Sequence, residues 1–165
     1  MKSPRLPRFL ASLAALLVWL TPWTAAQAQR PEQAVRQVID RLFDGMRAGD
    51  STMVRNAFDP GVRIVTTFTA ADGTPGLREG QLASFLQAVG APHDEVWDER
   101  IWDVVVHVED NLAAAWMKYA FFSGERFSHC GVDSFVLARR EAGWKIIHLA
   151  DTRHLAEACD PPPER

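Results

Sequence analysis

The sequence predicts an α+β domain in which N-terminal helices pack on a curved antiparallel sheet. Two observations support this prediction. Apolar residues recur three and four positions apart in the first half of the chain, and at every second position in much of the second half. Because the helices precede the strands in one chain of 165 residues, a single helical layer is expected to cover one face of a single sheet.

The first 28 residues are typical of a cleavable secretory signal peptide. Three basic residues and no acidic residue occupy positions 1–8, an apolar run interrupted only by Ser12 extends from Phe9 to Leu20, and Ala26-Gln27-Ala28 supplies small residues for cleavage. The apolar run is shorter than the roughly 20 residues that cross a bilayer. We therefore expect a periplasmic or secreted protein without a stable membrane anchor, and one domain over residues 29–165.

The charge balance argues against nucleic acid as a partner. The whole chain has a net charge of -3. Loss of the three basic residues of the leader gives the remaining domain a net charge of about -6. Phosphate backbones are bound by clustered Lys and Arg, and no such cluster occurs in the sequence. A small molecule is the more plausible kind of ligand.

The first half of the domain predicts three helices and one strand, each bounded by capping or turn residues. In order, we expect a helix from Pro31 to Gly49, a short helix capped by Asp50 and ended by Pro60-Gly61, a strand from Val62 to Thr69, a turn at 72–76, and a helix ending at Gly90.

The second half predicts a meander of four strands joined by short turns. The expected strands are Val96 to Val108, Leu112 to Phe122, Phe127 to Arg139, and Gly143 to Ala150.

The two cysteines, Cys130 and Cys159, predict a disulfide. In an exported protein a cysteine pair is more often bonded than free. The bond would close a loop of about 30 residues and stabilise the fold by about 3 to 4 kcal/mol in the chain-entropy model. We expect it to attach the C-terminal tail to the sheet.

The C-terminal half resembles the nuclear transport factor 2-like superfamily, and specifically its putative lumazine-binding group. The residues that carry the resemblance are Trp116, Tyr119, Phe121, His129-Cys130-Gly131-Val132-Asp133, Phe135, Gly143-Trp144-Lys145-Ile146 and Asp151-Thr152-Arg153. The resemblance implies a cone-shaped fold with a deep pocket between sheet and helices, often in homodimers. It also implies either plain ligand binding or chemistry without a cofactor, and the fold does not decide between them.

Two-residue turns predict which strand residues share the pocket face. A turn at Glu141-Ala142 would place Asp133 diagonal to His148, and a turn at Gly124-Glu125 would place Trp116 opposite Asp133. One bulge would shift the face by one residue and bring in Tyr119 instead. The predicted ligand-binding residues are Trp116, Lys118, Tyr119, His129, Asp133, Phe135, Trp144 and His148.

The other face of the sheet is also predicted to be apolar. Its expected members are Val104, Val106, Ala113, Ala115, Val132, Val136, Ile147 and Leu149. Because the helices can cover only one face, we expect a homodimer through the other.

Three hypotheses about function follow. The first is an exported domain that binds a small, flat or aromatic molecule in an aromatic-lined pocket. The second is an isomerase, dehydratase or cyclase without a cofactor, with Asp133 as general base and His129 or His148 as its acid partner. The third is a dimeric structural or interaction protein, in which the dimer face matters and the pocket has no remaining function. No metal-ligand spacing and no cofactor motif is recognised.

Overall fold

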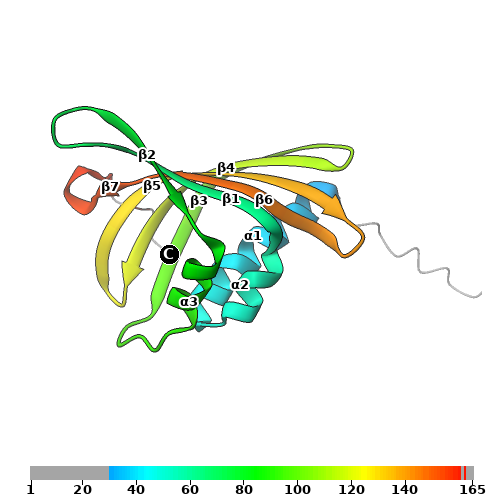
Figure 1. Cartoon of the computed structure of the whole chain (residues 1–165), viewed down its shortest axis with the longest axis horizontal. Coiled ribbons are helices and arrows are strands. Elements are labelled where there is room, and N and C mark those ends of the chain that lie inside the picture. Colours follow the sequence, from blue (N-terminus) through cyan, green and yellow to red (C-terminus); the bar gives the residue numbers. More distant parts are fainter. Residues whose placement is uncertain (1–29, 161, 163–165) are drawn as a thin grey trace, which may run out of the picture.

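The computed structural model describes residues 30–160 and residue 162, so the predicted signal peptide lies outside the described residues. Three helices precede most of the sheet, as the sequence predicts (Figure 1). The elements are α1 (Pro31–Ala48), α2 (Ser51–Ala57), β1 (Phe58–Thr69), β2 (Pro75–Gly80), α3 (Leu82–Gly90), β3 (Trp97–Glu109), β4 (Leu112–Ser123), β5 (Arg126–Arg140), β6 (Gly143–Thr152), β7 (His154–Leu155) and the 3-10 helix η1 (Ala156–Ala158).

The sheet curves over the three helices, which lie on its concave side (Figure 1). Its strand order is β2-β1-β6-β5-β4-β3, with β7 paired to β5. The four-stranded meander is antiparallel, but β1 pairs with β6 in parallel, so the sheet is mixed rather than wholly antiparallel.

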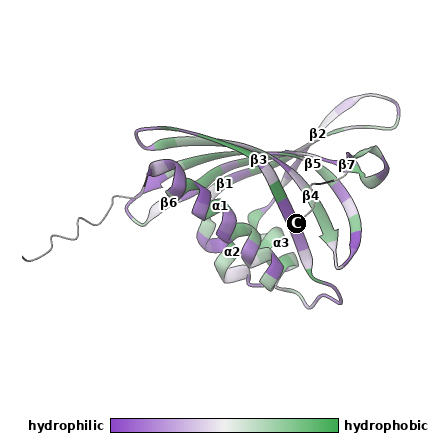
Figure 2. Cartoon of the chain, turned by 180° about the vertical axis from the view of Figure 1, so that it is seen from behind, coloured by the Kyte–Doolittle hydropathy of each residue, from purple (hydrophilic) through white to green (hydrophobic). Residues whose placement is uncertain are grey.

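The core lies between α1 and the concave face of the sheet. Residues three or four apart along α1 are buried against β3 and β6. In Figure 2 hydrophobic colour follows the strands where they pass over the helices, whereas hydrophilic and hydrophobic turns alternate along α1. The largest fully buried side chains are Tyr119, Phe135, Ile39, Leu42 and Met117.

The predicted end of the first helix and the predicted start of the second are both confirmed. Gly49 ends α1 in the left-handed conformation with φ 66°, which glycine adopts without strain. The Asp50 carboxylate then accepts hydrogen bonds from the backbone N–H groups of Thr52 and Met53, which caps α2. These caps fix the angle at which α1 and α2 cover the sheet.

The segment after α2 differs from the prediction. Strand β1 begins at Phe58, and Pro60 and Gly61 lie inside it rather than ending the helix. They fall where the pairing of β1 with β6 is irregular, between Phe58 and Arg63, and a strand tolerates proline at such an irregularity. Residues 75–76, expected in a turn, begin the additional strand β2.

Bulges in β5 and β6 make the predicted register wrong over part of the meander, and the pairing of β3 with β4 has a third irregularity between Trp102 and Val105. Ser128 is an extra residue in β5, so Phe121 pairs with His129 while Phe122 pairs with Phe127. Beyond that point every residue of β4 faces a partner one position later than the turn alone predicts.

The second bulge lies in β6. Arg140 pairs with Gly143 and Leu137 with Ile146, as predicted, but Val136 then pairs with His148, which leaves Ile147 as the extra residue. Together the two bulges place Asp133 opposite Met117 on one side and Asp151 on the other, instead of Trp116 and Ala150.

The apolar residues assigned to the uncovered face are in part misplaced by this register. Ala113 and Ala115 are buried in the core, and Val104, Val106 and Leu149 pack against it. The convex face instead carries Val132 and Val136, next to exposed side chains of β3 and β4.

The C-terminal tail folds back on the start of β5, where β7 pairs with His129 and Cys130. The predicted disulfide between Cys130 and Cys159 is present, with an S–S distance of 2.09 Å and Cα atoms 6.0 Å apart. Within the described part of the chain, no helix is long and apolar enough to span a membrane.

Candidate functional site

A cavity of about 370 Å³ lies between the concave face of the sheet and helices α1 and α3. One part of its wall is apolar and comes from both layers: Leu42, Phe43, Met46, Phe85, Phe135 and Leu149. The other part is polar. Most of it comes from the sheet and the segment after it: Thr66, Glu99, Tyr119, His129, Asp133, Asp151 and Arg153. Gln81 and Ser84 add two polar side chains at the start of α3. A small volume with an apolar wall and a few convergent polar groups is the usual form of a small-molecule site.

Strand alternation explains how the polar groups reach one wall. Glu99 lies on β3 between Trp97 and Ile101, which both pack against the core, so all three side chains point to the concave face. Asp133 and its partner Asp151 occupy matching positions on β5 and β6. The curvature of the sheet then brings β3 and β6 toward each other around the same cavity.

Gly131 permits a close crossing that completes this wall. A Cβ atom at this position would lie 1.9 Å from the carbonyl oxygen of Thr152 and 2.8 Å from the Tyr119 ring. Because Gly131 has no side chain, Thr152 can lie against it. There the Thr152 carbonyl accepts a hydrogen bond from the Tyr119 hydroxyl (2.9 Å), and Thr152 Oγ1 accepts one from the Val132 N–H (3.0 Å). These bonds fix Thr152, and therefore its neighbours Asp151 and Arg153.

Glu99 and Asp133 form a carboxyl pair within hydrogen-bonding reach of each other, in which Asp133 is buried and Glu99 is half-buried. Burial is the main cause that raises the pKa of both groups, to about 7 for Glu99 and well above its ordinary range for Asp133. Asp133 is 4% exposed, and its Oδ2 atom has no hydrogen-bond partner among the described residues. At neutral pH Asp133 is therefore the protonated member and Glu99 accepts its proton in a hydrogen bond.

The third carboxyl group, Asp151, lies closer to protein donors. Its pKa is raised by burial, while hydroxyl groups of Thr66 and Tyr119 and the positive charge of Arg153 oppose that rise. Burial also raises the pKa of Tyr119, with the nearby carboxyl groups adding to it, so its phenol stays neutral.

His129 lies at the edge of the polar wall as a neutral imidazole. Burial, helped by the positive charge of Arg153, lowers its pKa to about 4. Its ring stacks on Phe121 with centroids 4.8 Å apart, and Nδ1 is 3.0 Å from the Ser128 hydroxyl. Ser128 is the bulged residue, so the bulge both turns His129 inward and supplies its polar partner.

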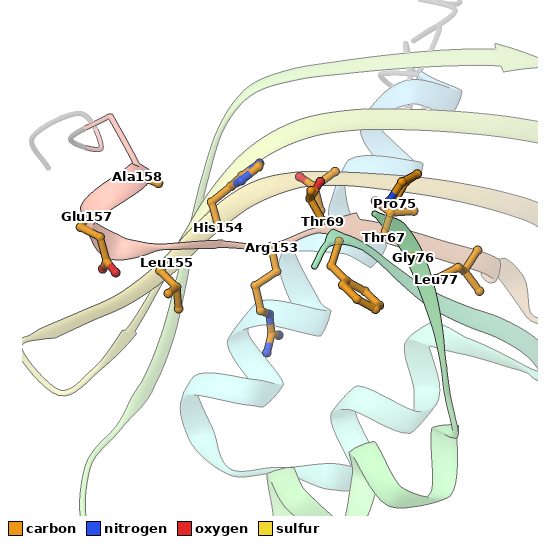
Figure 3. Close-up of a pocket in the computed structure, with 12 residues that line it drawn as sticks. Thr67, Thr69, Pro75, Gly76, Leu77, Arg153, His154, Leu155, Glu157 and Ala158 are labelled. Carbon is orange, nitrogen blue, oxygen red and sulfur yellow. The ribbon is translucent and has the colours of Figure 1, made fainter. Parts of the chain in front are cut away.

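Arg153 lies exposed at the mouth of the cavity. It makes no hydrogen bond and no ion pair within 4 Å in the part of the chain that the structure describes. Figure 3 shows its side chain directed toward the helix side of the sheet, whereas His154 beside it points to the other side. Arg153 also borders a second hollow of about 730 Å³ between the β1–β2 hairpin and the tail, an open depression whose lining includes the exposed Leu77 and Leu155 (Figure 3).

Four of the eight predicted ligand-binding residues line the cavity: Tyr119, His129, Asp133 and Phe135. The other four do not. Trp116 is 56% exposed on the convex face, and Lys118 on the same face forms an ion pair with Asp103 at 2.8 Å. Trp144 is buried in the core near the start of α1, and His148 lies opposite Val136, away from Asp133.

Three charged residues of the cavity are absent from the sequence-based site: Glu99, Asp151 and Arg153. Glu99 has a recognisable signal, because it is a charged residue between two apolar ones at strand spacing. Asp151 and Arg153 continue the alternation of Leu149 beyond the expected end of the last strand. Extending that alternation by three residues would have placed both on the pocket face.

Among the described residues, no group of three His, Cys, Asp or Glu side chains is arranged to hold a metal ion. The carboxyl groups of the cavity are spread over three strands, and two of them share a proton rather than converging on one point. The arrangement suits hydrogen bonding and proton transfer.

Comparison with solved structures identifies the fold class. The chain matches a nuclear transport factor 2-like protein of unknown function from Shewanella baltica with a TM-score of 0.58 and 19% identity, over 75% of this chain and 94% of the other. It matches a protein with a cystatin-like fold from Novosphingobium aromaticivorans with a TM-score of 0.60 and 14% identity, over 77% and 82%. The cone-shaped nuclear transport factor 2-like fold is thereby confirmed.

A third similar structure, from Streptomyces avermitilis, is described as a putative dehydratase of the same superfamily (TM-score 0.56, 18% identity, 76% and 96% covered). The family itself is identified from the sequence: residues 30–149 match the putative lumazine-binding family, and the chain belongs to it. No curated protein matches the chain.

Proposed function

We propose that this chain is an exported domain that binds a small, partly aromatic molecule in the cavity between its sheet and helices. The observation that carries the proposal is Asp133, a buried carboxyl group that faces the cavity with an unpartnered oxygen. Burying a polar group without a partner costs about 1 to 3 kcal/mol, which a bound ligand would offset. Membership of a family named for lumazine binding supports the same class of function.

Export is part of this proposal and has separate support. The Cys130–Cys159 disulfide is a bond that persists in oxidising compartments such as the periplasm. The leader over residues 1–28, whose sequence is typical of secretion, agrees with it.

Native mass spectrometry of protein purified without a ligand-stripping step tests the binding proposal. We expect a discrete small-molecule adduct on the wild-type chain. Ser84 lies on α3 at the cavity wall, so Ser84→Trp should block the cavity and abolish the adduct. Gln87→Trp is the matched control, because Gln87 is exposed on the same helix and does not line the cavity. An adduct that survives Ser84→Trp would place the ligand elsewhere and contradict the proposal.

Proton transfer on a bound carbonyl compound is a second candidate, favoured by the carboxyl pair. A general base works best with a pKa near the working pH, and burial raises the pKa of Glu99 to about 7. The base would therefore be Glu99 rather than Asp133, which holds its proton more tightly. Asp133 and neutral His129 would position and polarise the substrate, in the kind of cofactor-free chemistry that a dehydratase performs.

Deuterium exchange tests this candidate without knowledge of the substrate. Small enolisable ketones and diketones are incubated with the protein in D₂O, and loss of the α-proton signal is followed by NMR. We expect faster exchange than in buffer, and loss of that acceleration in Glu99→Gln. Equal exchange with and without the protein across the panel would leave binding as the function.

We further propose a homodimer through the convex face of the sheet. Trp116 and Val105 pair across β4 and β3 and are 56% and 49% exposed, next to Val132 and Val136 of β5. Neighbouring exposed apolar side chains of this size are characteristic of an interface. A second copy of the chain offers a self-complementary surface for them.

A further inference from the structure

The hydrogen-bond balance of the cavity limits the chemistry of its ligand. Glu99 and Asp133 together present four carboxyl oxygens, and within the described part of the chain no N–H or hydroxyl group donates to any of them. The only proton available to the pair is the one that they share. At least two of these oxygens therefore remain acceptors without a donor from the protein.

The polar groups nearest the carboxyl pair add mainly acceptors, whereas the possible donors Gln81 and Ser84 lie at the α3 side of the cavity. The proton of the Tyr119 hydroxyl is directed at the Thr152 carbonyl (2.9 Å) and at Asp151 Oδ2 (3.4 Å), so toward the cavity its oxygen acts as an acceptor. Asp151 is a third carboxyl group on the same wall. The one cationic group is Arg153, which lies at the mouth and forms no ion pair within 4 Å among residues 30–160.

We propose that the cavity binds a small organic cation, a protonated amine or amidine on an apolar body, with its N–H groups directed at Glu99 and Asp133. This inference rests on the proposed binding function and specifies its ligand. An amine or amidine supplies several donors and no acceptor, and donors are what the carboxyl pair lacks. A carboxylate ligand would instead add acceptors beside three carboxyl groups.

The apolar wall suits the body of such a ligand. Phe43 and Phe135 pack edge to face with ring centroids 6.3 Å apart, and Phe85 closes the wall from α3. Aromatic rings attract both flat ligands and organic cations. A volume of about 370 Å³ accommodates an aryl or alkyl amine of modest size. A bare metal ion fits less well, because no three donors in the described chain are grouped to coordinate it.

Binding of a cation should strengthen as the pH rises from 6 to 8. The groups facing Glu99 in the cavity are Asp133 of β5, Asp151 of β6, Tyr119 of β4 and Arg153 after β6. Helix α1 contributes only apolar side chains to this cavity. On the neighbouring hollow that Glu99 also borders, α1 carries Asp40, Asp44 and Arg47, and β3 carries Asp98 and Arg100. Burial raises the pKa of Glu99 to about 7, so its ionised fraction increases about tenfold over this interval. An amine with a pKa above 9 stays protonated throughout, so its affinity should rise by about the same factor.

Three probes of matched size test the inference: 2-phenylethylamine, 2-phenylethanol and 3-phenylpropionate. Dissociation constants are measured at pH 6 and pH 8 by isothermal titration calorimetry. Protein-observed NMR shifts at Tyr119 and His129 locate each probe in the cavity. We expect the amine to bind at least tenfold more tightly than the other two at pH 8, and about tenfold more weakly at pH 6 than at pH 8.

Variants separate charge recognition from shape. Glu99→Gln should weaken the amine at least tenfold while changing the alcohol by less than twofold. Arg153→Gln should tighten the amine severalfold, because it removes a like charge from the mouth. Glu109→Gln, at the exposed end of the same strand, is the control and should match wild type.

Each outcome bears on a different proposal. If the alcohol or the propionate binds in the cavity as tightly as the amine at pH 8, the cation inference is wrong and the binding function stands. If the amine binds equally well at pH 6 and 8, or equally to Glu99→Gln, the carboxyl pair does not recognise it and the inference is again wrong. If no probe binds and native mass spectrometry shows no adduct, the binding function fails as well.

Discussion

Replacing Glu99 by Gln tests the buried carboxyl pair through the pH dependence of folding. Burial raises the pKa of Glu99 from an ordinary 4.5 to about 7, so the folded chain keeps a proton that the unfolded chain releases in this interval. The contribution of Glu99 to stability is therefore largest below pH 4.5 and is lost as the pH rises to 7. At about 1.4 kcal/mol per pH unit, the loss is about 3 kcal/mol.

His129 acts with the opposite sign. Its pKa is lowered from 6.5 to about 4, so between pH 6.5 and 4 His129 is protonated in the unfolded chain and neutral in the folded chain. Its contribution is fully present above pH 6.5 and is lost as the pH falls to 4, again by about 3 kcal/mol. In wild type the two effects largely cancel between pH 4.5 and 6.5, while Asp133, whose pKa is also raised, adds a decrease with rising pH.

Single variants should expose each effect as a change relative to wild type. We compare each variant's free energy of unfolding with that of wild type at the same pH. As the pH rises from 4.5 to 7, this difference should increase by about 3 kcal/mol for Glu99→Gln and decrease by about 3 kcal/mol for His129→Asn. Urea denaturation at half-unit pH steps measures both. Glu109→Gln, exposed on the same strand as Glu99, should run parallel to wild type. A Glu99→Gln curve that stays parallel to wild type within about 1 kcal/mol would show that this carboxyl is not buried as described.

Three further variants test the surroundings of the site. Gly131→Ala should lower the free energy of unfolding by about 2 to 3 kcal/mol in urea titrations, because its Cβ meets the Thr152 carbonyl, and an unchanged midpoint would refute the close crossing. Replacing both Cys130 and Cys159 by Ser should cost about 3 to 4 kcal/mol under the same assay, and no change under non-reducing conditions would mean that the bond does not constrain the chain. Trp116→Lys should convert a dimer to a monomer in light scattering after gel filtration, and a wild-type protein that is already monomeric contradicts the proposed interface.

The helical layer was predictable because its signals are local. Apolar spacing, the glycine at the end of α1 and the Asp50 cap each act within one or two turns of helix. Strand positions in the meander were predictable for the same reason, since alternation and turn residues are short-range features. The parallel pairing of β1 with β6 was not, because it joins segments about 80 residues apart that carry no mutual signal in one sequence.

The site was predicted only in part, because an error in strand register at one position carries over to every later pair. The turns at Gly124 and Glu141 were identified correctly, but each bulge shifted all later pairs by one residue. Tyr119 and Asp133 remained on the pocket face, whereas Trp116 moved to the convex face. A bulge arises from how neighbouring strands curve together, and the residue types of Ser128 and Ile147 do not by themselves predict one.

The disulfide described above closes a covalent ring that runs from Cys130 to Cys159 and contains Asp133 and Arg153. The exposed turn after Arg140 lies in the same ring. A protease that cuts there opens the ring, yet both pieces stay joined by the disulfide and by the ladder between β5 and β6. Asp133, Asp151 and Arg153 of the polar wall are thus carried on a segment whose exposed turn can be severed without releasing either half.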